Sequence, residues 1–315
     1  MALSGMLFVS LPEEMNPNMV KLQGIIPPLP TSFHPNEKLY PEKIRENIGE
    51  LFRHDISGIV VMGSNGEFVL LTESEKEKVY ATAREAVPEG KLLIAGTGAQ
   101  STLETIRLTR LAARQEADAA LVLNPFYYKG MMNPEALIKH YHDVAEASTI
   151  PIVIYNMPSY SGVDMTASTI LRIASHPNII GIKDSDGNIV KLGEVIRESR
   201  EDFSVMAGSA GFLLPALASG ARGGIVALAN LLPRKCVEIL DYFGEDRLDD
   251  ARKIQQSIIP LNTAVTKKWG VPALKAAMDH LGMYGGPVRR PLMELEGRKK
   301  EILLKMLDTY MELGL

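Results

Sequence analysis

The stretch Ile179-Ile180-Gly181-Ile182-Lys183-Asp184-Ser185 is an apolar, largely β-branched run that ends abruptly in a lysine and two small polar residues. Such a run predicts a buried strand. Lysine is rarely fully buried unless it is paired or chemically used, and an apolar site disfavours the charged form of an amine. Lys183 is therefore a candidate Schiff-base nucleophile. The alternative is that its methylenes coat the strand end while its charge stays in water.

Seven further apolar runs alternate with amphipathic segments along the chain. We expect strands at residues 24–29, 58–62, 92–95, 119–123, 150–155, 179–183, 203–207 and 224–228. Helical spacing of apolar residues predicts helices at 73–86, 102–116, 134–147, 166–174 and 190–199. Thr72 and Glu75 form a capping-box pattern at the start of the first of these helices. Eight strand candidates with helices between them predict an α/β fold, a closed (β/α)8 TIM barrel.

The pattern changes after Leu228, because no further strand is expected. Residues 233–243, 248–265, 271–281 and 298–313 are predicted to be helical. We therefore expect an N-terminal arm at 1–20, a catalytic barrel at 21–230 and a C-terminal helical extension at 231–315. A loop dense in Gly and Pro precedes the last helix, and its residues Arg289 and Arg290 either bind an anion or contact solvent.

Composition narrows the classes of partner and compartment. The 315 residues carry a net charge of −4, so there is no electrostatic case for nucleic acid or an anionic membrane as a partner. The single cysteine, Cys236, excludes an internal disulfide and a multi-cysteine metal site, and cytoplasm is the expected location. The apolar run at 6–9 is too short to span a bilayer and lacks a preceding basic residue. His140 and His142 point to different helix faces, so no metal site is expected.

In barrels of this kind the working residues lie at the carboxyl ends of the strands. The second strand is followed by Gly63-Ser64-Asn65-Gly66-Glu67, where two glycines allow a tight turn. Such a turn holds a carboxylate on its N–H groups, hydroxyl and amide, or simply connects strand to helix. Tyr127 and Tyr155 follow the fourth strand and close the fifth, and their phenols either shuttle protons or fill the core edge. Small residues around Gly208 and before Ile225 let a ligand approach the backbone.

Together these motifs resemble the dihydrodipicolinate synthase and N-acetylneuraminate lyase family of class I aldolases, over most of the chain. The resemblance implies a (β/α)8 barrel with a C-terminal helical extension, usually assembled as a tetramer. Lys183 resembles the Schiff-base lysine of the family, and Tyr155 resembles its proton-transferring phenol. Ser64 and Asn65 occupy the positions that bind the carboxylate of a 2-oxo acid. Tyr127 resembles the tyrosine that relays protons from across a subunit interface.

The choice of family member depends on a few positions. The synthases have two adjacent threonines where this chain has Ser64-Asn65, and an arginine where it has Tyr160. The segments 63–68, 127–128, 183–185, 207–213 and 284–287 resemble 4-hydroxy-2-oxoglutarate aldolase more closely. Asn156 does not fit the resemblance to 4-hydroxy-2-oxoglutarate aldolase. The synthases and lyases have asparagine at this position, whereas the animal aldolase has serine.

We therefore expect a Schiff-base lyase that cleaves or forms a 4-hydroxy-2-oxo acid, with pyruvate as the 2-oxo acid and an aldehyde as the other partner. Ser185, Gly208 and Ile225 are expected to contact the substrate. No cofactor or metal is expected, because the lysine imine serves as the electron sink. The alternatives are a dihydrodipicolinate synthase, a sugar-acid aldolase or dehydratase of the same family, and a non-catalytic barrel that binds a 2-oxo acid.

Overall fold

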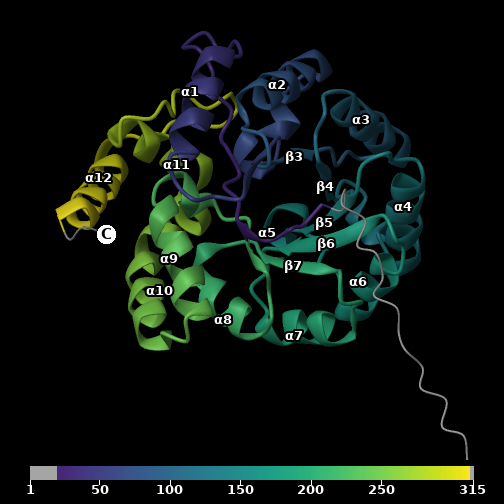
Figure 1. Ribbon diagram of the computed structural model, residues 1–315. Helices are drawn as coiled ribbons and strands as arrows, with labels where there is room; N and C mark the ends of the chain where they lie inside the picture. The colour runs from purple at the N-terminus through teal and green to yellow at the C-terminus, as the bar shows by residue number, and fades with distance from the viewer. Residues whose placement is uncertain (1–19, 313–315) are drawn as a thin grey trace, which may run out of the picture.

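The computed structural model describes residues 20–312, and its centre is a barrel of eight parallel strands (Figure 1). The sheet order is β1-β8-β7-β6-β5-β4-β3-β2. The Leu29 N–H donates to the Val60 carbonyl at 2.8 Å, and the Val60 N–H donates to the Pro27 carbonyl at 2.9 Å, which joins β1 to β2 and closes the barrel. The predicted (β/α)8 fold is confirmed. The strands are β1 (Gly24–Ile25), β2 (Gly58–Val61), β3 (Leu92–Gly96), β4 (Ala119–Leu123), β5 (Ile152–Asn156), β6 (Ile179–Asp184), β7 (Ser204–Ala207) and β8 (Gly223–Gly224).

Two strands are shorter than the sequence predicts. β1 stops at Ile25 because Pro27, Pro28 and Pro30 have no N–H group to donate to a ladder. β8 stops at Gly224, and the apolar run after it turns into the 3₁₀ helix η5 (Ala227–Asn230). An apolar run alone does not show where a buried strand becomes a buried turn.

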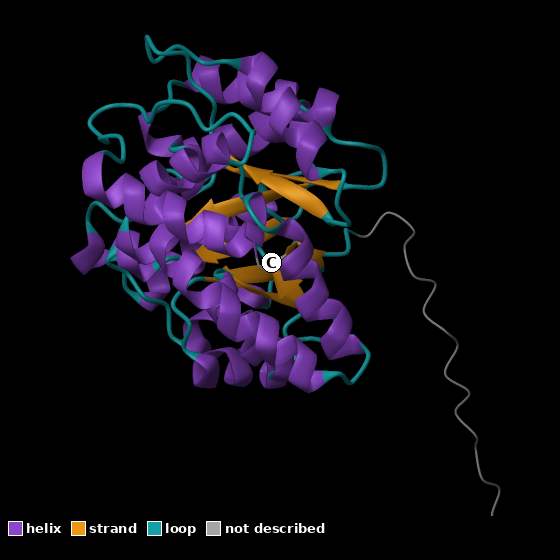
Figure 2. Ribbon diagram, turned by 90° about the vertical axis from the view of Figure 1, so that its left-hand side faces the viewer, coloured by secondary structure: helices purple, strands orange, loops and turns teal. Residues whose placement is uncertain are grey.

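Helices surround the barrel, as Figures 1 and 2 show. The capping box at Thr72 and Glu75 is confirmed. The helices α1, α5 and α8 are not predicted from sequence; α1 begins with a proline at its first position, and α5 and α8 are short. The helices around the barrel are α1 (Pro41–Leu51), α2 (Glu73–Ala86), α3 (Thr102–Arg114), α4 (Pro134–Glu146), α5 (Pro158–Ser161), α6 (Ala167–Ala174), α7 (Ile189–Glu198) and α8 (Leu213–Ala218).

Four further helices follow β8 on one side of the barrel (Figure 1). They are α9 (Pro233–Gly244), α10 (Leu248–Thr263), α11 (Gly270–His280) and α12 (Gly297–Glu312), with the π-helix η6 (Ala264–Lys268) after α10. Arg289, on the loop before α12, is paired within the chain rather than left in solvent: its guanidinium binds the Glu75 carboxylate at 2.7 and 2.8 Å. The predicted arm at 1–20 lies outside the described residues except for Val20. Among residues 20–312, every helix is too short or too polar to cross a bilayer.

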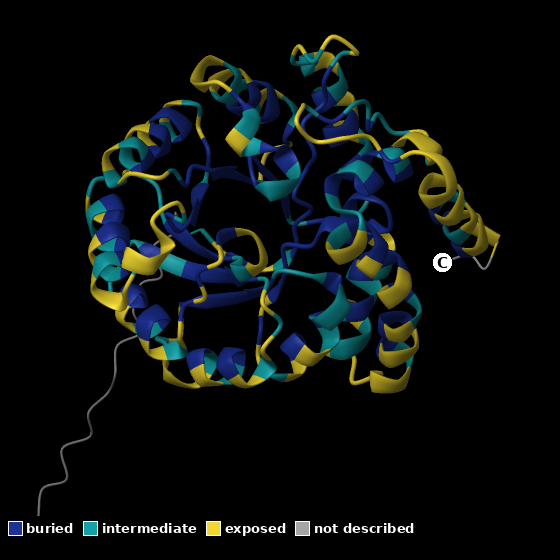
Figure 3. Cartoon of the chain, turned by 180° about the vertical axis from the view of Figure 1, so that it is seen from behind, coloured by how far each residue is buried: buried dark blue, intermediate teal, exposed yellow. Residues whose placement is uncertain are grey.

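The strands bury both faces, as their dark colour in Figure 3 shows. One face packs against the surrounding helices in the main hydrophobic core. The other fills the barrel interior with a smaller cluster that includes Val153, Tyr155, Met206 and Ile225. Because side chains alternate along a strand, each residue at a strand end faces either the interior or the helices. This alternation decides which polar residues meet one another at the site.

Candidate functional site

Lys183 lies near the carboxyl end of β6, and its side chain is only 4% exposed. In the sheet register it stands opposite Tyr155 on β5 and Met206 on β7, both members of the interior cluster. Its amine therefore points into the barrel, with Nζ 4.2 Å from the centroid of the Tyr155 ring. The sequence placed an amine at the end of an apolar strand, and the fold sets that amine against a phenol.

Tyr155 connects the lysine to the turn after β2. Its hydroxyl lies 3.1 Å from Ser64 Oγ, close enough for a hydrogen bond in either direction. The turn begins as the 3₁₀ helix η1 (Ser64–Gly66), just after Met62, whose φ of 58° is unusual for a residue with a side chain. A Cβ on Gly96 would lie 1.9 Å from the Met62 carbonyl oxygen, so β3 needs a glycine there for the turn to reach Tyr155.

Asn65 lies beside Ser64 in the same turn. Its side-chain amide donates to the Pro28 carbonyl at 3.4 Å, a long bond that ties the turn to the chain after β1. Both residues are partly exposed.

Ser185 and Gly208 meet at the ends of β6 and β7. The Ser185 hydroxyl donates to the Gly208 carbonyl at 3.5 Å, and the Gly208 N–H donates to the Asp184 carbonyl at 2.7 Å. A Cβ at position 208 would lie 2.0 Å from Ser185 Oγ, so a side chain there would displace the serine. Ile225, which follows β8, is fully buried in the interior cluster with Tyr155.

Tyr127 does not join this group within one chain. Its side chain is 75% exposed, and its ring packs edge-on against Tyr128 at 5.0 Å between centroids. Gln100 Oε1 accepts the backbone N–H groups of Phe126 and Tyr127 at 3.0 and 2.8 Å, which fixes the loop that presents the ring. Within residues 20–312 its hydroxyl contacts neither Tyr155 nor Ser64, so its predicted relay role stays a prediction.

A polar cluster on the outer side of the same two strands was missed in the sequence. Asn156 and Asp184 directly follow Tyr155 and Lys183, and therefore face the helices. The Asn156 amide donates to Asp184 Oδ2 and to Asp164 Oδ1, both at 2.8 Å. Lys191 of α7 lies 2.7 Å from Asp164 and 3.3 Å from Asp184. Polar residues in a buried strand need partners, and that requirement is the signal by which this cluster is recognisable in the sequence.

The cluster holds together the two strand ends that carry the lysine and the phenol. Burial opposes the charge of Lys191, but the carboxylates of Asp164, Asp184 and Asp186 outweigh it and raise the pKa of the amine. The Asp184 side chain is fully buried, and it contacts the Lys191 amine and accepts a hydrogen bond from the Asn156 amide. The residues that clamp the strands are thus distinct from those that face the barrel interior.

Replacing Lys191 by methionine is expected to lower the free energy of unfolding by about 2–3 kcal/mol, because it leaves the Asp184 charge uncompensated while water still reaches Asp164 and Asp186. Urea denaturation measures the loss. Lys139→Met is the matched control, since Lys139 is 77% exposed and pairs with Asp143 on its own helix. Equal unfolding midpoints for the two variants would contradict the clamp.

Comparison with known proteins agrees with this geometry. The model of the Dihydrodipicolinate synthetase family matches residues 21–310. A 4-hydroxy-tetrahydrodipicolinate synthase of Methanoculleus marisnigri is 38% identical, covering 91% of this chain and 99% of its own. A probable mitochondrial 4-hydroxy-2-oxoglutarate aldolase of Emericella nidulans is 35% identical, covering 94% and 97%. A prophage protein of the dihydrodipicolinic acid synthase family from E. coli K12, solved in complex with pyruvate, superposes with a TM-score of 0.86 at 28% identity, covering 92% and 99%. The resemblance predicted from the motifs is confirmed: the chain belongs to the dihydrodipicolinate synthetase family, whose members are lyases that act through a pyruvate-derived Schiff base.

Proposed function

We propose that this enzyme catalyses the reversible retro-aldol cleavage of a 4-hydroxy-2-oxo acid to pyruvate and an aldehyde, and that it is most like 4-hydroxy-2-oxoglutarate aldolase. One observation carries the proposal. The buried Lys183 amine lies 4.2 Å from the Tyr155 ring centroid, and the Tyr155 hydroxyl lies 3.1 Å from Ser64 Oγ. An amine, a phenol and a hydroxyl in contact supply a nucleophile and a route for its protons.

In the proposed reaction the neutral Lys183 amine adds to the C2 carbonyl and water leaves, which forms an iminium. The C3–C4 bond then breaks, and its electron pair moves into the iminium to give an enamine. Tyr155 accepts the C4 hydroxyl proton as the aldehyde forms, while its own proton passes through Ser64 toward solvent, and a proton returning along the same route reaches C3. Protonation of the enamine at C3 and hydrolysis of the imine release pyruvate and restore the amine. The imine is the electron sink, so the scheme requires no cofactor.

The turn after β2 is assigned to the substrate carboxylate. Ser64 and Asn65 would hold it beside Lys183 and so fix the carbonyl against the amine. Orienting an intramolecular attack in this way lowers the activation barrier by up to about 7–11 kcal/mol. Ser185, Gly208 and Ile225 would border the rest of the substrate.

Condensation of pyruvate with aspartate semialdehyde is the second candidate, favoured by the relative from Methanoculleus marisnigri that bears the synthase name. Tyr160 argues against it, because the resemblance puts an arginine there in the synthases. Tyr160 lies on α5, and its hydroxyl lies 3.7 Å from the point that a Cβ would occupy at Gly270, in the C-terminal extension. A sugar-acid aldolase or dehydratase would keep the same imine.

Incubation with pyruvate, reduction with borohydride and mass analysis of the protein test the imine. We expect one adduct on Lys183, and its absence would rule out the mechanism. Parallel assays with 4-hydroxy-2-oxoglutarate, with pyruvate plus aspartate semialdehyde, and with sugar acids then identify the aldehyde partner. Faster turnover of the semialdehyde would assign the chain to the synthases. Thermal stabilisation by pyruvate without turnover of any substrate would favour a binding barrel.

The proposal includes a cytoplasmic homotetramer with Tyr127 completing a neighbouring subunit's site. Support comes from exposed apolar side chains in the segments that follow β3 and β4, namely Leu103, Tyr127, Tyr128 and Met131, each at least 68% exposed. Large exposed apolar patches commonly mark interfaces. The proposal also divides the chain into a catalytic barrel at 21–230 and a C-terminal helical extension at 231–315. Light scattering of the protein as it elutes from a size-exclusion column measures its molar mass and so tests for a tetramer.

A further inference from the structure

Glu67 ends the turn that carries Ser64 and Asn65. Its backbone is left-handed, with φ 55°, and joins η1 to the next 3₁₀ helix, η2 (Phe68–Leu70). Residues other than glycine hold this conformation only where their surroundings require it. The side chain is fully buried, which is rare for a glutamate unless it is paired. The cause of both features lies outside the barrel.

The partner of Glu67 is Lys275 of α11, in the C-terminal extension. Lys275 Nζ lies 2.6 Å from Glu67 Oε1, and both side chains are at most 1% exposed. The other carboxylate oxygen accepts the Arg289 N–H at 2.8 Å, so two separate segments of the extension meet at one glutamate. Lys275 also donates to the Pro287 carbonyl at 2.7 Å and lies over the Phe33 ring.

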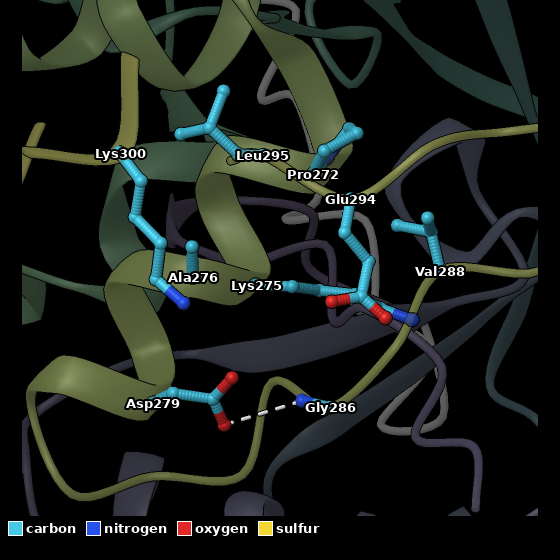
Figure 4. Close-up of a pocket in the computed structure, with 9 residues that line it drawn as sticks. All are labelled: Pro272, Lys275, Ala276, Asp279, Gly286, Val288, Glu294, Leu295 and Lys300. Atoms are coloured by element: carbon cyan, nitrogen blue, oxygen red, sulfur yellow. Dashed lines mark hydrogen bonds between the residues drawn. The ribbon is translucent and has the colours of Figure 1, made fainter. Parts of the chain in front are cut away.

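The extension is itself held rigidly where it makes these contacts. Figure 4 shows Lys275 directed toward the loop that carries Val288, and Asp279 accepting a hydrogen bond from the Gly286 N–H. A Cβ on Gly285 would lie 1.9 Å from the Lys275 carbonyl oxygen, so the loop packs directly on the α11 backbone. Lys275 therefore has little freedom to move away from Glu67.

The opposite side of the turn is tied to the active groups. The Gly66 carbonyl accepts the Thr31 hydroxyl at 2.7 Å, and Ser64 Oγ contacts the Tyr155 hydroxyl. Only a few residues of rigid backbone separate the Glu67 carboxylate from the Ser64 hydroxyl. A shift at Glu67 is thereby transmitted to the proposed carboxylate site and to Tyr155.

Stability alone does not account for such a pair. Removing two charges from water opposes folding, and neutral side chains of similar size often stabilise as well or better. Burial lowers the pKa of Lys275 even though Glu67 lies beside it, which reflects this opposition. The pair therefore has a conformational use at a turn that ends in a left-handed residue.

We infer that Glu67 and Lys275 are positioning residues through which the C-terminal extension sets the geometry of the turn that binds the substrate carboxylate. The inference rests on the proposed role of Ser64 and Asn65. It assigns to the extension a direct effect on the affinity for pyruvate, beyond support of the barrel.

The test is the pyruvate concentration that gives half-maximal borohydride trapping, measured together with the thermal unfolding midpoint. The double variant Glu67→Gln/Lys275→Met removes both charges and keeps side-chain size, so it is expected to fold with a midpoint near that of wild type. We expect its half-saturating pyruvate concentration to rise by about tenfold, which corresponds to about 1.4 kcal/mol. The inference would be overturned if the double variant had both the unfolding midpoint and the half-saturating pyruvate concentration of the wild type.

Glu67→Gln alone is the second variant, and trapping is measured below its own unfolding midpoint, which should fall because the buried Lys275 amine loses its counter-charge. It leaves an acceptor for the Arg289 backbone N–H, and we expect half-saturation to rise by about threefold because the hydrogen bond to a carboxylate becomes one to a neutral amide; wild-type half-saturation would also overturn the inference. Glu75→Gln is the matched control, since Glu75 pairs with Arg289 on the same loop but does not touch the turn. It should unfold earlier and trap pyruvate as wild type does. Failure of wild-type enzyme to form any adduct would refute the proposed function instead, which keeps the two outcomes distinct.

Discussion

Lys183→Met is expected to abolish both the pyruvate adduct and turnover, with a loss in rate of at least about 10⁴-fold, because oriented covalent attack alone supplies about 7–11 kcal/mol. The methionine side chain fills nearly the same volume in the interior cluster beside Tyr155. It also removes a buried amine, so the free energy of unfolding should stay the same or rise. Mass analysis after borohydride reduction and a coupled assay for pyruvate release measure the two losses.

A covalent pyruvate adduct on the Lys183→Met variant would show that another lysine is the nucleophile. Lys191 is the nearest alternative in sequence, but its amine is engaged by carboxylates on the helix side of the barrel. The exposed Lys139→Met variant should retain full trapping and turnover. Together the methionine variants of Lys183, Lys191 and Lys139 distinguish a loss of catalytic activity from the effect of removing a positive charge and from a loss of stability.

Tyr155→Phe is expected to form the pyruvate adduct and yet lose turnover by about 10²–10⁴-fold, the usual contribution of a positioned proton-transfer group. Phenylalanine keeps the ring that lies against Lys183 but removes the hydroxyl 3.1 Å from Ser64 Oγ. Adduct formation needs the amine, whereas cleavage of the C3–C4 bond also needs an acceptor for the hydroxyl proton. Trapping and steady-state turnover, measured on one preparation, should therefore respond differently.

Tyr141→Phe is the matched control. Tyr141 of α4 is also buried, but its hydroxyl donates to the Val122 carbonyl of β4 at 2.9 Å, on the helix side of the barrel. Losing that bond should cost about 1 kcal/mol of stability and leave turnover intact. Turnover of Tyr155→Phe close to that of wild type would remove Tyr155 from the proton relay.

The turn after β2 illustrates how far the sequence reaches toward the site. Its two glycines and polar residues predict a ligand-binding turn, and the order of strands predicts that it shares a barrel face with Lys183. The distance from Ser64 to Tyr155 depends on Gly96, which lets the turn approach β3, and on Glu67, which Lys275 holds from the far end of the chain. Neither constraint has a local signature, because each is a contact between residues distant in sequence.

The sequence by itself determined the barrel, most of its helices and the residue types at the strand ends, because apolar periodicity and turn residues act over a few positions. Tertiary structure decided which of those residues meet. Side-chain alternation sends Lys183 and Tyr155 inward, and Asp184 and Asn156 outward to Lys191. The prolines after Ile25 end β1 early, and packing of the extension buries the Glu67–Lys275 pair. These outcomes follow from strand register and burial, which exist only once the barrel has closed.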